Sequence, residues 1–226
     1  MAQQRRIAIT GAFGTLGAAV VRAALAAGHA VAAIDRAPVP SGLGAAHGFG
    51  GVDLADETAA KGVIDAAAEA LGGLDALVNI AGTFRFETLA DGSADTWDLL
   101  YRVNLRTAIS ASRAALAHLP DERGRIVNIG AAAALKAGAG MGAYTASKSG
   151  VMRFTEALAE ELKPRGITVN ALLPSIIDTA PNRADMPKAD FSRWVKPEQL
   201  AAVILFLLSA DASAITGALI PVVGRV

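Results

Sequence analysis

The stretch "RIAITGAFGTLGAAVV", residues 6–21, joins a short apolar run to an alanine-rich run. The first run, 6–10, has the length and the partly β-branched composition of a buried strand, and 15–27 has the composition of a helix. Three glycines mark the junction of the two runs: Gly11, Gly14 and Gly17. Because glycine lets the backbone turn tightly, the stretch predicts a strand, a tight turn and a helix in immediate succession.

The same alternation continues along the rest of the chain. Further strands are predicted at 30–35, 74–82, 124–130, 166–174 and 218–224. Further helices are predicted at 57–71, around 95–118, around 144–163 and near 197–208. Strands that are apolar on both faces and alternate with helices form parallel sheets with a helical layer on each side. The sequence therefore predicts the α/β class, with a single Rossmann-type doubly wound parallel sheet of about seven strands and helices on both faces.

No long linker and no repeat interrupts this alternation, so residues 1–226 are predicted to form a single domain. One segment, 175–196, breaks the alternation, because it holds two prolines, several charges and the aromatic residues Phe191 and Trp194. Long irregular segments of this kind are usually functional loops. We expect this segment to be a substrate-binding loop or lid.

The composition limits the kinds of partner. Lys and Arg balance Asp and Glu at 21 each, and a zero net charge gives no reason to expect nucleic acid or an anionic membrane. The apolar run 200–208 is too short to span a bilayer, and glycines interrupt the N-terminal apolar run that would otherwise resemble a signal peptide. Without cysteine, and with three widely spaced histidines, a metal site is not expected. We expect a cytoplasmic protein that binds a small molecule.

The glycine turn at 11–17 has the placement of a phosphate-binding turn. Its glycines let a pyrophosphate approach the backbone, and the helix that follows presents free N–H groups and a partial positive charge. We therefore predict that five residues of the turn contact a dinucleotide: Gly11, Phe13, Gly14, Thr15 and Leu16. A glycine-rich turn without a ligand is the alternative interpretation.

Asp35 ends the second predicted strand. A carboxylate at this place accepts hydrogen bonds from ribose hydroxyls and repels a 2′-phosphate, which favours NAD(H). The adjacent Arg36 can bind a 2′-phosphate if it turns inward, so NADP(H) is also compatible, but a solvated loop residue is the simpler interpretation of Arg36. Asp53 and Leu54 are predicted beside the adenine, although a lone Asp before a helix more often caps that helix.

Tyr144 and Lys148 lie four residues apart at the start of a predicted helix, so they share one face. An ammonium group near a phenol favours the phenolate and lowers the pKa of the tyrosine toward neutrality. The pair therefore predicts a general acid and base. An exposed, inert pair is the alternative, and the dinucleotide turn upstream favours the catalytic interpretation.

Together these motifs resemble those of the short-chain dehydrogenase/reductase superfamily over essentially the whole chain. The matching residues are Thr10-Gly11-x-x-Gly14-x-x-Gly17, Asp35, Asp53-Leu54, Asn79-Ile-Ala81-Gly82, Asn104, Tyr144-x-x-x-Lys148 and Pro174-Ser175-x-x-x-Thr179. The resemblance implies an NAD(P)(H)-dependent oxidoreductase. It also implies a homodimer or homotetramer that pairs through the helices around 95–118 and 144–163.

The resemblance assigns roles to individual residues. Asn79, Ala81 and Gly82 would form the wall beside the adenosine ribose. Lys148 would bind the nicotinamide ribose and tune Tyr144. Asn104 would hold a water that relays protons to Lys148, and a buried structural amide is the alternative role for Asn104.

Three residues after the predicted strand at 166–174 complete the implied nicotinamide site. Pro174, the backbone around Ile177 and the hydroxyl of Thr179 would fix the carboxamide. For Thr179 a helix cap is the alternative role.

The chain departs from the superfamily at the catalytic serine, whose position before the tyrosine is occupied by Ala131. Residue 130 and residues 132–134 offer no hydroxyl either. The serine normally donates a hydrogen bond to the substrate oxygen, and the loss of such a donor costs roughly a few kcal/mol of barrier. Dihydropteridine reductases in the same superfamily also lack this serine, and the stretches 130–148 and 173–194 resemble theirs.

This narrower resemblance implies an NADH-dependent reductase of a planar conjugated compound such as quinonoid dihydropterin, with Tyr144 as the acid. The candidate substrate contacts are Ala131, Phe84, Phe86, Met141 and Trp194. Two alternatives stay open. In the first, a carbonyl reductase or alcohol dehydrogenase takes its hydroxyl from Thr145, Ser147 or a loop residue. In the second, the chain is a non-catalytic nucleotide-binding regulator, against which the intact Tyr144 argues.

Overall fold

A computed structural model describes residues 4–42, 44 and 46–226; residues 1–3, 43 and 45 of the predicted domain lie outside it. Within the described residues, seven strands form one parallel sheet in the order β3-β2-β1-β4-β5-β6-β7. The strands are β1 Arg6–Thr10, β2 Ala30–Ile34, β3 His47–Phe49, β4 Ala76–Asn79, β5 Arg125–Ile129, β6 Thr168–Pro174 and β7 Leu219–Val222. The predicted fold class is confirmed.

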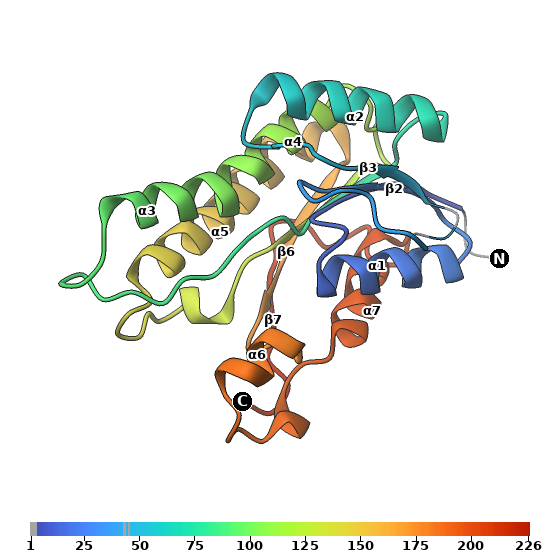
Figure 1. The fold of residues 1–226 in the computed structure, drawn as a ribbon. Coiled ribbons are helices and arrows are strands. Elements are labelled where there is room, and N and C mark those ends of the chain that lie inside the picture. The colour runs from blue at the N-terminus through green and yellow to red at the C-terminus, as the bar shows by residue number, and fades with distance from the viewer. Residues whose placement is uncertain (1–3, 43, 45) are drawn as a thin grey trace.

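Helices cover both faces of this sheet (Figure 1). The α-helices are α1 Thr15–Ala26, α2 Glu57–Leu71, α3 Ala94–Tyr101, α4 Thr107–Ala115, α5 Gly142–Leu162, α6 Ala180–Asp185 and α7 Pro197–Leu208. A π-helix, η1 Arg102–Arg106, joins α3 to α4, and short 3-10 helices occur at η2 Ala132–Ala134, η3 Lys163–Arg165 and η4 Phe191–Arg193. No helix in the described part of the chain is long and apolar enough to cross a membrane.

The hydrophobic core consists of two layers, one on each face of the sheet. On one face, α1 and α7 pack on alternate residues of the strands, among them Ile7, Ile9 and Val127. On the other face, α2, α4 and α5 pack on the intervening residues, among them Ala8, Leu77 and Ile126. Because every central strand is apolar on both faces, the β1, β4 and β5 strands lie buried, and their carboxyl ends meet at one edge of the sheet.

Two predicted boundaries differ from the structure at the sheet. The predicted strand 74–82 is shorter, because the amides of Ile80 and Ala81 donate to the hydroxyl of Thr10 instead of to a neighbouring strand. The edge strand β3 ends at Phe49 and pairs with β2, in a stretch for which no separate strand was predicted. This edge strand has no apolar run of its own, so periodicity could not reveal it.

The segment 175–196 is not an open loop, because it contains two short helices, α6 and η4, and packs its own aromatic side chains together. Its Trp194 is buried and its ring lies 4.8 Å from that of Phe191. The Arg183 guanidinium lies over the Phe191 ring and also pairs with Asp178. The segment is attached at its base, since Arg193 donates two hydrogen bonds to the carbonyl oxygen of Arg225.

Candidate active site

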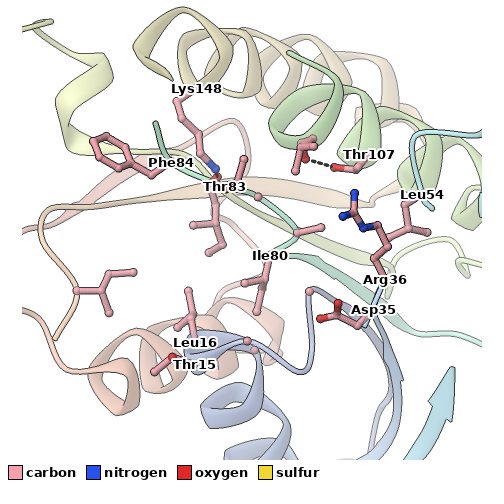
Figure 2. Close-up of a pocket in the computed structure, with 18 of the residues that line it drawn as sticks. Thr15, Leu16, Asp35, Arg36, Leu54, Ile80, Thr83, Phe84, Thr107 and Lys148 are labelled. Carbon is pink, nitrogen blue, oxygen red and sulfur yellow. Dashed lines mark hydrogen bonds between the residues drawn. The ribbon is translucent and has the colours of Figure 1, made fainter. Parts of the chain in front are cut away.

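A cleft of about 610 Å³ lies at the carboxyl edge of the sheet, where β1, β2, β4, β5 and β6 end. Most of the predicted site residues line it: Gly11, Gly14, Thr15, Leu16, Asp35, Arg36, Asp53, Leu54, Ala81, Gly82, Phe84, Tyr144, Lys148, Pro174, Ile177 and Thr179. The remaining ones lie outside this lining: Phe13, Asn79, Asn104, Ala131, Phe86, Met141 and Trp194. Figure 2 shows Asp35 and Arg36 at one end of the cleft and Phe84 and Lys148 at the other.

The backbone of the glycine turn is packed so closely that a side chain would not fit at two of its glycines. A Cβ on Gly17 would lie 2.1 Å from the carbonyl oxygen of Gly11, and a Cβ on Gly11 would lie 2.7 Å from the amide of Ala81. Gly11 also has a φ of +63°, which favours glycine. The turn is therefore packed too closely for any residue but glycine at these two positions.

The start of α1 supplies the donors for a pyrophosphate. Its N-cap, Gly14, has no side chain to accept hydrogen bonds from the first turn. The first N–H groups of a helix have no partner within the helix, and together with the helix dipole they attract phosphate. The residues present thus fit the dinucleotide that the glycine spacing predicts.

Asp35 lies directly after β2 with both carboxylate oxygens engaged. One oxygen accepts from the amide of Phe13 at 2.9 Å and the other from the amide of Ala37 at 3.0 Å. A carboxylate has about four acceptor positions, so acceptor capacity remains toward the cleft. Phe13 itself is half-buried against the α1 layer, so its contribution to the site is this backbone N–H.

Arg36 lines the cleft and is exposed, which is compatible both with a solvated loop residue and with a contact to a ligand. Figure 2 shows its side chain extending beside Leu54. Asp53 pairs with Arg102 through a 2.6 Å contact and accepts from the amide of Ala55. The helix cap that was the alternative role for Asp53 is supplied by Asp56, whose carboxylate accepts from the amide of Ala59.

Asn79 belongs to a buried amide network and not to the wall of the cleft. Its side-chain nitrogen donates to Ser112 at 3.0 Å and to Asn128 at 2.9 Å. Asn128 in turn donates to the hydroxyl of Thr155 on α5. The network ties β4 and β5 to α4 and α5, so its loss would reduce stability and not only cofactor contact.

Asn104 sits in the π-helix η1, an irregularity that often marks functional sites. Its side-chain oxygen accepts from the amide of Thr83 at 2.6 Å, and its nitrogen donates to Ser147 at 2.9 Å. Both ends of the amide therefore make direct protein contacts. A water relay to Lys148 would have to use other atoms, and that role of Asn104 stays a prediction.

Tyr144 and Lys148 project into the cleft from the first turns of α5, on a shared face. Lys148 is buried and donates to the carbonyl oxygen of Ile129 at 2.8 Å. Burial lowers the pKa of Lys148 to about 8 and raises the pKa of Tyr144 to about 12. The expected lowering of the tyrosine pKa by the ammonium group is therefore wrong for this structure, because desolvation is the dominant cause. Tyr144 is a neutral phenol at neutral pH, able to donate a proton.

The comparisons with known proteins place this geometry in a family. A family model described as short chain dehydrogenase matches residues 5–190. The chain is 35% identical to 2-(S)-hydroxypropyl-CoM dehydrogenase 3 of Xanthobacter autotrophicus, over 96% of this chain and 94% of that protein. It is 32% identical to meso-2,3-butanediol dehydrogenase of Serratia marcescens, over 96% and 92%. A short chain dehydrogenase from Burkholderia cenocepacia, solved in complex with NADP, superimposes with a TM-score of 0.85 at 33% identity, over 98% of this chain and 97% of the other.

The chain belongs to the short-chain dehydrogenase family. It is accordingly an NAD(P)-dependent oxidoreductase. The narrower resemblance to dihydropteridine reductases is not reflected in these relatives, which carry the names of alcohol dehydrogenases.

Two hydroxyls considered as substitutes for the family's serine are directed away from the cleft. Thr145 is buried and donates to the carbonyl oxygen of Met141, and Ser147 donates to the carbonyl oxygen of Tyr144. Both hydroxyls thus serve the backbone of α5. Ala131 is buried and directly follows Gly130, which lines the cleft.

The aromatic residues near the catalytic end divide into two groups. The ring of Phe84 meets the ring of Tyr144 edge-on, with centroids 4.9 Å apart. Phe86 instead lies against Gly140, where a Cβ would come within 2.3 Å of its ring. Trp194 lies in the core of the 175–196 segment, so its prediction as a substrate contact is not supported by its position. An aromatic residue in a loop looks the same in sequence whether it packs inward or faces a ligand.

On the opposite wall, Thr179 has the geometry of a helix cap. Its hydroxyl accepts from the amide of Asn182 at the start of α6, and it also lines the cleft. Asn182 donates to the carbonyl oxygen of Ile177, which fixes the backbone of this wall. The cap and a contact to a ligand are compatible, since the hydroxyl can accept one bond and donate another.

Sequence reasoning missed several residues that line the cleft. Leu99, Val103 and Thr107 follow one another at intervals of four along α3, η1 and α4. That spacing marks one helix face and was available as a signal. Thr83 and Arg85 were missed as well; they flank Phe84 directly after β4, in a segment that carries no regular periodicity.

Proposed function

We propose that this short-chain dehydrogenase transfers hydride from NAD(P)H to a planar conjugated acceptor, of which quinonoid dihydropterin is one example. The observation that carries the proposal is Tyr144, a half-buried neutral phenol with an aromatic neighbour, Phe84, at the end of a dinucleotide cleft. A flat ring can stack or pack edge-on beside Phe84. A neutral phenol suits the donation of a proton during reduction.

In this proposal, residues of the chain position the dinucleotide and donate a proton to the acceptor. The amides of the α1 turn and the Asp35 carboxylate would hold the nucleotide end, and Lys148 would bind the ribose next to the reacting ring. The dinucleotide supplies the hydride. Tyr144 donates the phenolic proton to the reduced acceptor and regains a proton from solvent, so one hydride and one proton enter the product.

For the cofactor, we propose a preference for NAD(H), with NADP(H) as a compatible second. Asp35 supports NAD(H), since a carboxylate disfavours a 2′-phosphate. Arg36 supports NADP(H), because its side chain lines the cleft and directly follows Asp35 in the chain. The similar Burkholderia cenocepacia protein was solved with NADP, so binding of NADP(H) has to be measured alongside binding of NAD(H).

A second candidate is a carbonyl reductase or alcohol dehydrogenase, and the names of the similar dehydrogenases favour it. With Ala131 in place of the serine and with Thr145 and Ser147 bonded elsewhere, the hydroxyl would come from the lining of the cleft. Thr83 is a hydroxyl residue of that lining, whereas the hydroxyl of Ser175, which also lines the cleft, donates to the carbonyl oxygen of Val223. A non-catalytic nucleotide-binding regulator is the third reading, and it leaves the Tyr144 phenol without a task.

The experiment that separates these candidates follows the absorbance of NADH and NADPH with a panel of quinonoid dihydropterin, quinones and simple ketones. Turnover of the conjugated acceptors supports the proposal, turnover of ketones alone supports the second candidate, and binding without turnover supports the third.

Ala131→Ser sharpens this experiment, because Ala131 has an extended backbone that accepts serine without strain. The added hydroxyl should raise kcat/KM for ketones about tenfold or more, since an oxyanion donor is worth roughly 10²-fold. For a conjugated acceptor the change should stay within about threefold. A variant that improves both kinds of substrate equally would contradict the proposed reason for the missing serine.

We also propose a homodimer or homotetramer. Support comes from α3, which presents the half-exposed side chains of Trp97 and Tyr101, four residues apart, next to α5. Large apolar patches on a surface usually mark contacts with another chain. Light scattering after gel filtration tests this, and a monomer at micromolar concentration would contradict it.

A further inference from the structure

Four arginines gather at the amino edge of the sheet, opposite the active-site cleft: Arg5, Arg6, Arg123 and Arg125. The nearby carboxylate is Asp75, which Arg6 engages through its backbone amide and two guanidinium nitrogens. Arg6 and Asp75 thereby neutralise each other. Three guanidinium groups remain, and Arg123 reaches Asp75 only at 3.5 Å.

Two of these three arginines are buried. Arg5 is 6% exposed and Arg125 is 2% exposed. Fully buried arginines are rare in proteins unless a partner of opposite charge compensates them. Within the described residues, Arg5 donates to the carbonyl oxygen of Arg123, and Arg125 donates to that of Gly124. A neutral carbonyl satisfies a donor but does not cancel the charge.

The three guanidinium groups also repel one another. Burial lowers the pKa of Arg125, and the charge of Arg123 lowers it further. The pKa of Arg5 is lowered by burial first and then by Arg125, although Asp75 partly offsets this. Four guanidinium groups thus share the carboxylate of Asp75, and the excess positive charge raises the energy of the buried arginines.

Unsatisfied donors collect at the same place. Among the described residues, the buried side-chain atoms without a hydrogen-bond partner include Arg123 Nε, Arg125 Nε and Thr168 Oγ1. Arg125 and Thr168 are paired in register on β5 and β6, so their side chains leave the same face of the sheet. A guanidinium can only donate, so the missing partner of the two arginines is an acceptor.

We propose that Arg5, Arg123, Arg125 and Thr168 form a second binding site, for an oxyanion such as a phosphate or carboxylate group. Only an anion supplies both the acceptor atoms and the negative charge that the cluster lacks, and guanidinium groups match such oxygens in pairs. Solvent reaches the edge along Arg6 and Arg123, whose side chains are 35% and 44% exposed. The site is independent of the redox reaction and stabilises the fold when it is filled.

The test measures the melting temperature of the protein in sodium phosphate against sodium chloride at equal ionic strength. Parallel titrations with sulfate and with acetate distinguish a phosphate-type from a carboxylate-type ligand. At about ten times its dissociation constant, the bound anion should raise the melting temperature by about 3–5 °C, growing with the logarithm of its concentration.

Arg125→Met tests the assignment, and Arg113→Met is the matched control, since Arg113 is an exposed arginine on α4 that pairs with Glu57. The phosphate-dependent shift should persist in Arg113→Met and disappear in Arg125→Met. Each shift is measured within one variant, so a change in basal stability does not affect the comparison. If Arg125→Met does not fold, Arg123→Met removes the half-exposed member of the cluster and should show the same loss.

An equal shift in the parent protein and in the cluster variants would overturn the proposal, because phosphate would then act at the glycine turn or through general salt effects. No shift in the parent protein would also overturn it, because water would then satisfy the donors. Neither result bears on the redox activity, so the proposed function is tested separately.

Discussion

Asp35 has two tasks at the end of β2, and they can be separated by mutation. Its carboxylate holds the amide of Phe13 in the glycine turn and faces the cleft beside Arg36. Asp35→Asn keeps an acceptor for the Phe13 amide but removes the charge. We expect this variant to bind NADH about tenfold more weakly and NADPH with little loss, because the repulsion of a 2′-phosphate is gone.

Arg36→Met is the counterpart at the neighbouring residue. It should weaken binding of NADPH about tenfold and leave NADH within about twofold, since only a 2′-phosphate needs the guanidinium. Fluorescence titration of both cofactors with both variants checks the pair. The assignment of the two residues fails if the variants change NADH and NADPH binding in parallel.

Lys148 predicts a particular dependence of stability on pH. Burial lowers its pKa from 10.5 to about 8 in the folded chain. Below about pH 8 the ammonium is charged in both the folded and the unfolded chain, and the folded chain bears the full cost of burying it. As the pH rises from 8 toward 10.5, the folded chain loses this proton before the unfolded chain does. The free energy of unfolding should therefore rise across this window.

Lys148→Met provides the reference, because it fills a similar volume without a charge. Relative to this variant, the free energy of unfolding of the parent should rise by about 1–2 kcal/mol between about pH 7 and about pH 9.5, as urea unfolding can measure. Tyr144 acts in the opposite sense, since its raised pKa lowers stability only above pH 10. Identical pH profiles for the two proteins would show that Lys148 is not desolvated.

At the residue scale, the sequence predicted the charged and glycine positions better than the aromatic ones. Asp35, Tyr144 and Lys148 follow predicted strand ends or share a helix face, and such placement can be read from periodicity. Trp194 and Phe86 could not be placed this way, because packing against Phe191 and Gly140 depends on partners brought together by the fold.

At the element scale, the glycine turn makes the sharpest prediction. Gly17→Ala puts a methyl group 2.1 Å from the carbonyl oxygen of Gly11 and should lower the free energy of unfolding by about 3 kcal/mol. Gly14→Ala is the matched control, since the nearest atom is 3.6 Å away and its φ of −73° suits alanine. We expect a change of about 0.5 kcal/mol or less for the control. Urea unfolding compares them, and equal losses would refute the packing argument.

The elements themselves were largely predictable. α2 and α7 have the predicted bounds, and β1 begins and ends as expected, since all three carry strong periodicity or apolar runs. The helix predicted around 95–118 consists of α3, η1 and α4 in direct succession. The π-helical turn η1 could not be predicted, because it does not change the spacing of the apolar residues. The three-residue edge strand β3 is exposed over His47 and Gly48, and it was not predicted because it has no apolar run.

At the scale of the whole molecule, the parallel sheet places different chemistry at its two edges. The carboxyl ends of the strands form the cleft, as expected for a doubly wound sheet, and this follows from topology alone. The amino ends collect the arginine cluster, whose members are separated by more than a hundred residues in sequence. Only the folded chain brings Arg5 next to Arg123, so no local pattern could have predicted that site.

Tyr144→Phe tests whether Tyr144 donates the proton during hydride transfer. Phenylalanine keeps the ring that meets Phe84 and removes only the hydroxyl. We predict that kcat falls about 10²-fold or more with the best acceptor of the panel, while the dissociation constant of the dinucleotide stays within about threefold. Full turnover by Tyr144→Phe with every substrate that the parent accepts would contradict the account.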